Sequence, residues 1–237
     1  VLMKKDKAAY LALYDREGNS LAEGEIHGQN GGYPIAIALS NDAVKLAVSM
    51  ININEGSVKS TIAFYNYGTV GQNEIDHCVG VNNYDDMVIP EMEFTSNDRM
   101  VAFGDTKAVI FEGAQKPQAI AEIPMDEKTK SIFYNEHYIG IVTGNEDEAV
   151  TNHLAVYDEN GKLVMEKDFG LDYSSIEFLT NNEICIRNAN VCDIYTVHGV
   201  YKFHHEFEEE LFEIIPGKLK LNYTLVLKDT TQRIRLK

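Results

Sequence analysis

The sequence predicts an all-β fold, a β-propeller made of four-stranded antiparallel blades like those of WD repeats. Three observations predict it: an aromatic-to-glycine turn recurs five times, a polar turn recurs between these turns, and helix signals are scarce. Self-similarity at this period is typical of propeller blades and decides the whole fold. We expect about five blades in this chain, as part of a larger propeller.

The first turn series joins an aromatic strand end to a tight turn that closes in glycine. Its members recur on average about every 45 residues, which is the size of one four-stranded blade. The turns are Tyr14–Gly18, Tyr65–Gly68, Phe111–Gly113, Tyr157–Gly161 and Tyr195–Gly199. We expect each to connect strands c and d, the third and fourth strands of a blade.

The second series is a polar turn between two short apolar strands, which we expect to be strands a and b. Ser, Asn and Asp suit such turns because their side chains bond nearby backbone amides. The turns are Ser40–Asp42, Ser96–Asp98, Asn135–Glu136, Thr180–Asn182 and Pro216–Lys218. The two series interleave in a fixed order, so each unit is a meander of four antiparallel strands.

These repeats predict one propeller domain over residues 1–237. The repeat units lie at residues 33–80, 88–123, 130–169, 175–207 and 211–236. Residues 8–27 form a partial blade with strands c and d only, and an isolated two-stranded hairpin is marginal in water. The simplest interpretation is that further blades precede Val1 in the intact protein. Residues 70–83 are predicted to form either a turn of helix or a long irregular loop.

The composition of the chain limits the kinds of partner that it can bind. The chain has 21 basic and 37 acidic residues and a net charge of −16, so its average field repels a nucleic-acid backbone. Its apolar stretches fall well short of the roughly 18 residues that span a bilayer. The three cysteines do not form a disulfide framework, and buried thiols are the preferred interpretation. The alternative that Cys185 and Cys192 meet across a hairpin stays open.

Several stretches resemble one known family. They are Gly32–Ser49, Ala63–Asp76, Val101–Asp105 and Phe133–Glu136, and the run Phe-Tyr-Asn-x-Gly-x-Val-Gly-Gln-Asn-Glu-Ile-Asp is the most specific. The chain is similar over nearly its whole length to an uncharacterised propeller-like family of Clostridia-type Gram-positive bacteria. The resemblance implies an extracytoplasmic propeller at the cell membrane, held by an N-terminal anchor. It implies no catalytic residue and no ligand.

Two carboxylates are the first site candidates. Asp85 and Asp86 follow Tyr84 just before strand a of the second repeat unit, where loops reach the propeller face near its central channel. Paired carboxylates can perform acid and base catalysis if their surroundings separate their pKa values. The alternative is that they cap a turn and keep the surface soluble.

Tyrosines on loops are the second candidates. Most aromatic residues recur at the ends of strand c, so we interpret them as packing between blades. Tyr33, Tyr84 and Tyr173 lie on loops instead, where a tyrosine offers both contact area and a polar tip to a partner.

The sequence contains only weak candidates for metal ligands. Glu146, Asp147 and Glu148 cluster on a loop and have the oxygen ligands that calcium prefers, but their spacing fits no known calcium loop, so a solvated loop tip is the alternative. His204 and His205 are adjacent and would point to opposite faces of a strand. We therefore expect no metal and no organic cofactor.

Two functions remain. The leading hypothesis is a non-enzymatic binding or scaffolding propeller on the outer side of a bacterial membrane, which contacts a protein or a cell-wall glycan through loops on one face. The alternative is a carbohydrate-active hydrolase or lyase with carboxylates at the central channel. Two acidic side chains about 5 to 9.5 Å apart across a cleft would favour the enzyme.

Overall fold

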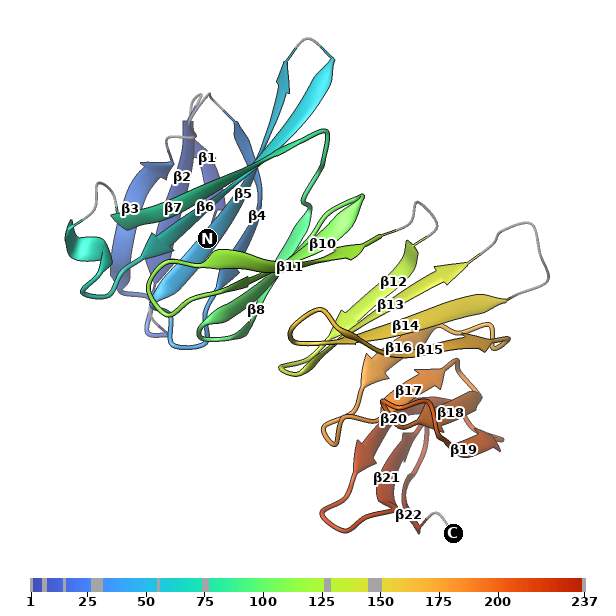
Figure 1. The fold of residues 1–237 in the computed structure, drawn as a ribbon. Helices are drawn as coiled ribbons and strands as arrows, with labels where there is room; N and C mark the ends of the chain where they lie inside the picture. The colour runs from blue at the N-terminus through green and yellow to red at the C-terminus, as the bar shows by residue number, and fades with distance from the viewer. Residues whose placement is uncertain are drawn as a thin grey trace. The chain divides into compact units, whose positions relative to one another are not determined.

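The structure is a computed structural model and describes residues 2–5, 8–14, 16–26, 32–54, 56–73, 77–125, 129–144 and 151–235. Within these residues, every regular element except the 3-10 helix η1 (Gly71–Asn73) is a β-strand. The strands form six antiparallel sheets that follow one another along the chain (Figure 1). The chain divides into unit 1 (Val1–Glu127) and unit 2 (Lys128–Lys237), each with three sheets.

Unit 1 begins with a three-stranded sheet and continues with two four-stranded sheets. The first sheet contains β1 (Leu2–Lys5), β2 (Ala8–Tyr14) and β3 (Ser20–Ile26). The second contains β4 (Tyr33–Leu39), β5 (Lys45–Asn54), β6 (Ser57–Asn66) and β7 (Cys78–Asp85). The third contains β8 (Glu91–Ser96), β9 (Arg99–Phe103), β10 (Lys107–Glu112) and β11 (Gln118–Pro124).

Unit 2 begins with two four-stranded sheets and ends with a three-stranded sheet. The fourth sheet contains β12 (Thr129–Tyr134), β13 (Tyr138–Gly144), β14 (Asn152–Asp158) and β15 (Leu163–Phe169). The fifth contains β16 (Ser175–Phe178), β17 (Ile184–Arg187), β18 (Val191–Tyr195) and β19 (Tyr201–Glu206). The sixth contains β20 (Leu211–Pro216), β21 (Asn222–Leu227) and β22 (Thr231–Arg235).

Each sheet is a meander in which neighbours in sequence are neighbours in space. The all-β class and the four-stranded antiparallel blades are therefore confirmed. The turn chemistry explains why the chain reverses where it does. Four of the five closing glycines of the aromatic turns, Gly18, Gly113, Gly161 and Gly199, have positive φ angles, which other residues rarely adopt.

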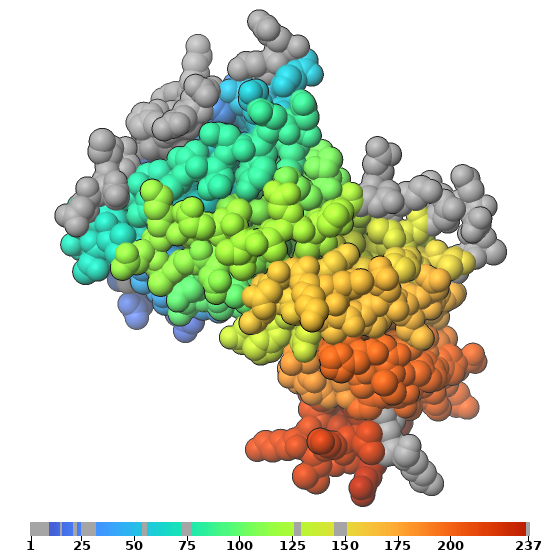
Figure 2. Space-filling model, viewed as in Figure 1, coloured from blue at the N-terminus to red at the C-terminus, as the bar shows by residue number. Residues whose placement is uncertain are grey.

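In unit 1 the apolar core lies between successive sheets. Side chains alternate along a strand, so one strand serves two cores. On β5, Ala47 faces the third sheet in a cluster with Phe64 and Phe111, whose ring centroids are 5.1 Å apart. Val48 faces the first sheet in a cluster with Leu11. In the space-filling view the second and third sheets, coloured blue to green, form one continuous surface (Figure 2).

Unit 2 is built in the same way. On β17, Ile184 and Ile186 pack with Phe133 and Leu154 of the fourth sheet, whereas Cys185 packs with Leu225 of the sixth sheet. The side chains of both cores are apolar and mostly buried.

Cys185 and Cys192 are free, fully buried thiols on neighbouring strands, and their Sγ atoms lie 3.6 Å apart. The hydrogen bond to Cys185 and burial raise the pKa of the Cys192 thiol. The two interpretations drawn from sequence are therefore compatible, because the thiols are buried and also meet across the β17–β18 hairpin.

The turn of helix that was one alternative for residues 70–83 is present as η1, the one helix among the described residues there, and a strand begins at Cys78. Two local expectations need correction. The first sheet includes β1, so the partial blade does have a strand b; this strand was missed because it is only four residues long and contains Lys4 and Lys5. Strand β7 reaches Asp85, beyond the expected end of the unit at residue 80, because the connection from β6 is longer than the other aromatic turns.

Candidate functional site

The antiparallel meander gives every sheet two different ends. The a–b and c–d turns lie at one end, which we call the turn end. The b–c loops and the linkers to the next sheet lie at the other, which we call the loop end. All the polar and aromatic-to-glycine turns of the sequence pattern are therefore at the turn end, whereas Tyr33, Tyr84, Asp85, Asp86 and Tyr173 are at the loop end.

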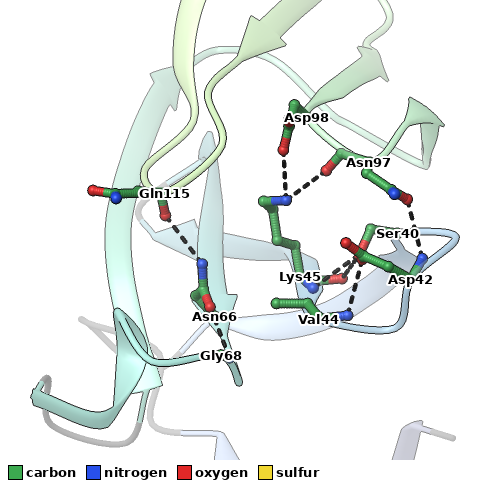
Figure 3. Close-up of polar contacts among 9 residues, drawn as sticks. All are labelled: Ser40, Asp42, Val44, Lys45, Asn66, Gly68, Asn97, Asp98 and Gln115. Carbon is green, nitrogen blue, oxygen red and sulfur yellow. Dashed lines mark hydrogen bonds and ion pairs between the residues drawn. The ribbon is translucent and has the colours of Figure 1, made fainter.

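At the turn end of unit 1, hydrogen bonds join the second sheet to the third (Figure 3). The Lys45 side chain is only 6% exposed, and its Nζ donates to the carbonyl oxygen of Asn97 and to Oδ1 of Asp98, both at 2.7 Å. The Asp42 backbone N–H donates to Asn97 Oδ1 at 3.0 Å. Asn66 Nδ2 donates to the carbonyl of Gln115 at 3.4 Å. These polar groups bind one another, so they form a structural joint.

The Asp42 carboxylate organises its own turn within this joint. It accepts hydrogen bonds from Ser40 Oγ at 2.6 Å and from the Val44 backbone N–H at 3.1 Å. Burial opposes ionisation, but these hydrogen bonds and the Lys45 charge outweigh it and lower the pKa of Asp42. The turn is therefore most stable with this aspartate ionised.

Unit 2 has comparable joints. Asn135 Nδ2 donates to Asn182 Oδ1 at 2.8 Å and so links the a–b turns of the fourth and fifth sheets. Between the fifth and sixth sheets, Glu183 accepts hydrogen bonds from the Lys202 ammonium and from the Tyr223 hydroxyl. The side chains of Glu183 and Lys202 are 12% and 18% exposed, so this ion pair is largely screened from water.

At the loop end, Tyr84, Asp85 and Asp86 have structural partners. Burial, with a smaller contribution from the negative charge of Glu122, raises the pKa of Tyr84 to about 12. Asp85 forms an exposed ion pair with Lys59 at 2.7 Å. Asp86 has a left-handed backbone, and its N–H donates to the Val58 carbonyl at 2.7 Å. Asp85 thus takes part in a cross-strand ion pair, and Asp86 lies in the turn that follows β7.

Tyr173 lies in the linker between the fourth and fifth sheets. Its hydroxyl is 2.7 Å from Ser131 Oγ, and its ring packs on Phe169 with centroids 5.6 Å apart. It therefore fixes the linker to β12. Glu146, Asp147 and Glu148, the calcium candidates, lie outside the described residues.

Tyr33 is different because its side chain is 66% exposed. It pairs with Ile51 across β4 and β5, and Ile53, which is 68% exposed, lies two residues further along β5. Paired residues and residues two apart share a face of a sheet. Tyr33, Ile51 and Ile53 therefore form one apolar surface, which we call the hairpin-tip patch.

The hairpin-tip patch lies where β5 and β6 extend past their neighbouring strands. Strands β5 and β6 pair as far as Asn54 and Ser57, beyond the ends of β4 and β7 (Figure 1). The linker to the third sheet runs along this hairpin. The Asp86 N–H donates to the Val58 carbonyl, opposite Ile53, at 2.7 Å. Ser60 Oγ and Ser49 Oγ donate to the Met87 and Ile89 carbonyls at 2.7 and 2.8 Å. Sequence reasoning identified Tyr33 but missed Ile53, because the length of the hairpin cannot be read from its apolar alternation.

The chemistry of the described residues is limited. No group of three or more His, Cys, Asp or Glu side chains is placed to hold a metal ion in this part of the chain. His204 pairs with Asp193 at 2.7 Å, whereas His205 packs against Phe207, so the adjacent histidines do point apart. Glu91 and Glu93 share a face of β8, and burial, together with the negative charge of Glu91, raises the pKa of Glu93.

No helix among the described residues is long and apolar enough to cross a membrane.

Solved structures share the fold at low sequence identity. Sqt1 from Chaetomium thermophilum is 10% identical with a TM-score of 0.50, and the match covers 82% of this chain and 56% of that chain. The β-propeller domain of the Trilobed protease from Pyrococcus furiosus, described as having an open velcro topology, is 10% identical with a TM-score of 0.49, and the match covers 86% and 70%. The Pan2 WD40 domain of Neurospora crassa is 8% identical with a TM-score of 0.46, and covers 98% and 73%.

This chain therefore spans little more than half of the Sqt1 chain. Likeness at such identity concerns the fold alone, and it agrees with the blade architecture of the sheets. No curated protein matches the sequence. A family model of unknown function, DUF5711, matches residues 1–236. The chain is thus a β-propeller that belongs to the DUF5711 family of unknown function.

Proposed function

We propose that this protein is a non-enzymatic binding module that contacts a protein partner through the hairpin-tip patch. The observation that carries the proposal is the exposure of Tyr33 and Ile53, 66% and 68%, on one face of a projecting hairpin. Scattered exposed apolar side chains are ordinary, but neighbouring ones on a projecting element suit an interface. Tyrosine is also enriched at the centres of interfaces.

The rest of the site supports binding over catalysis. Asp85 forms an exposed ion pair with Lys59 at 2.7 Å, and the Asp86 backbone N–H donates to the Val58 carbonyl, so both residues have structural contacts. The enzyme alternative needs two carboxylates that face each other across a cleft. Asp85 and Asp86 are instead consecutive residues at one strand end.

We place this binding on the outer side of a bacterial cell membrane, with an N-terminal anchor in the intact protein. The support is the resemblance carried by the sequence stretches around Gly32–Ser49 and Ala63–Asp76. Protease treatment of intact cells tests the placement: degradation of the propeller without cell lysis is expected, and full protection would contradict it.

A photo-crosslinking residue at position 33 tests the binding surface, with the same residue at position 120 as a control. Ile120 is an exposed apolar residue on β11, away from the hairpin. The captured protein is then purified and its affinity measured. We expect Tyr33→Ser and Ile53→Ser each to weaken binding by about tenfold or more, as for a central interface residue, and Ile120→Ser to leave it unchanged.

Two outcomes would contradict the proposal. Equal crosslinking at positions 33 and 120 would show that the hairpin-tip patch is not the contact surface. Saturable binding of purified cell-wall glycan that is lost in Tyr33→Ser, without a protein partner, would assign the patch to a glycan instead.

A further inference from the structure

Two buried thiols meet inside unit 2. Cys185 of β17 and Cys192 of β18 are both 0% exposed, and their Sγ atoms lie 3.6 Å apart. Cys185 pairs with Ile194 across the two strands. Cys192 pairs with Arg187, two residues further along β17, so the two thiols form a diagonal on one face of the hairpin. Diagonal positions are normally further apart than directly paired ones. The contact between the sulfur atoms is therefore a specific feature of the β17–β18 hairpin.

The surroundings of the pair are apolar. Both thiols face the sixth sheet, where they pack in one core with Ile214, Tyr223 and Leu225. A thiol is only a weak hydrogen-bond donor and acceptor, so the core gains little from a polar contact between the two. A disulfide would join the same sulfur atoms at about 2.05 Å without adding a polar group. The apolar core therefore suits a disulfide at least as well as two thiols.

The folded protein shields this pair from reagents in solution. The thiolate is the form of cysteine that attacks a disulfide. The hydrogen bond to Cys185 and burial raise the pKa of the Cys192 thiol, and the positive charge of Arg187 opposes this rise without cancelling it. Neither cysteine has exposed surface. An oxidant can therefore reach the pair only before the sixth sheet covers it, or when that sheet separates from the fifth.

We propose that Cys185 and Cys192 are a disulfide-forming site, which a small-molecule disulfide oxidises while unit 2 folds and which the completed core then closes to further exchange. One thiolate attacks a sulfur atom of the oxidant, and a mixed disulfide forms as one thiol leaves. The second thiolate attacks the protein sulfur of that mixed disulfide and displaces the second thiol. The two cysteines thus lose two electrons and two protons, and the S–S bond of the oxidant is reduced to two thiols.

The bond would cross-link strands b and c of the fifth sheet. This sheet shares one core with the fourth sheet and another with the sixth, so the cross-link lies in the sheet on which both cores of unit 2 depend. Disulfides persist in oxidising compartments and are rare in reducing ones. The state of the pair therefore reports the compartment in which unit 2 folded. The site lies in the core of unit 2 and not on the hairpin-tip patch, so this inference and the proposed function can fail independently.

The test uses the full 237-residue chain with Cys78→Ser, which removes the third cysteine and leaves the pair. The protein is unfolded and reduced in urea, and is then refolded with a mixture of oxidised and reduced glutathione. Mass spectrometry of unreduced peptides should show a bond between Cys185 and Cys192 in most of the monomer. Near-UV circular dichroism should match that of protein refolded with dithiothreitol, because the core accommodates both states.

A matched control moves one thiol to the other face of the hairpin. In the same background, Cys192→Ala with Val191→Cys shifts the cysteine by one position along β18, and adjacent residues of a strand point to opposite faces. Refolding with glutathione should then give mixed disulfides and no bond between positions 185 and 191. The separation of the two thiols along the chain is almost the same in both proteins, so a difference between them reports the tertiary contact.

Exchange rates test whether folding closes the site. Glutathione disulfide should oxidise the reduced, folded pair at least about a hundredfold more slowly than the same pair in urea, because exchange requires local opening. The oxidised, folded protein should resist reduction by dithiothreitol by a similar factor.

Three results would overturn the proposal. One is refolded protein in which the pair stays reduced, or in which each thiol carries glutathione. Another is an equal yield of the intramolecular bond in the Val191→Cys control. The third is oxidation or reduction of the pair in the folded protein at the rate seen in urea, because the core would then not close the site.

Discussion

The turn end and the loop end of the sheets are made by the same strands but have different surfaces. At the turn end, side chains such as Lys45 and Glu183 bind groups of the next sheet and are largely buried. At the loop end of the second sheet, Tyr33 and Ile53 are exposed and apolar. The comparison indicates that the turn end holds neighbouring sheets together through buried polar side chains, while part of the loop end of the second sheet is exposed, as a binding surface must be.

Loss of the Glu183 carboxylate should have the largest effect on stability. Glu183→Ala leaves the Lys202 ammonium and the Tyr223 hydroxyl without their shared acceptor. Removing one partner of a largely buried ion pair should lower the free energy of unfolding by about 3 kcal/mol, measured in urea. The control is Glu122→Ala, whose more exposed ion pair with Lys107 at 2.7 Å should contribute less than about 1 kcal/mol. Equal losses would remove the distinction between the joint and an ordinary surface pair.

The Asp42 turn should show a smaller effect that depends on pH. Its pKa is lowered in the folded protein, so its contribution to stability is present above the unfolded value near 3.8 and is lost as pH falls through the folded value. We expect Asp42→Asn to destabilise by less than about 1 kcal/mol at pH 7, because the carboxylate is exposed. Thermal unfolding at pH 7 and pH 3 should show a smaller difference at pH 3 than at pH 7. A difference that is larger at pH 3 would contradict this sign.

Substitution at the hairpin tip should have the smallest effect. Ile53→Ala removes an exposed side chain and should change the free energy of unfolding by no more than about 0.5 kcal/mol. Ile62→Ala on β6 of the same hairpin removes a fully buried side chain and should cost at least about 2 kcal/mol. Similar losses for the two variants would show that the hairpin tip is packed in solution and would count against a free binding surface.

The fold could be predicted because its two series of turns carry recognisable residues. The glycines that close the aromatic turns were readable because positive φ angles such as 76° at Gly161 exclude most other residues. The polar turns were readable because Asn and Asp side chains bond their own backbone, as Asp42 does with Val44. These signals are local, so one sequence suffices to find them. Strand β1 carries neither signal and was therefore missed.

The candidate site was less predictable because exposure depends on neighbours that are distant in sequence. Tyr33, Tyr84 and Tyr173 look alike along the chain. Tyr84 lies below Lys107, with Nζ 5.8 Å from its ring centroid, and Tyr173 contacts Ser131, whereas Tyr33 is open to solvent. Only the tertiary structure separates the three.

The placement of each core between consecutive sheets also bears on how the protein folds. The second sheet shares one core with the first sheet and another with the third, and the fifth sheet does the same in unit 2. A middle sheet therefore cannot melt without exposing two cores. Cooperativity is thus a property of neighbouring pairs of sheets and not of any single blade.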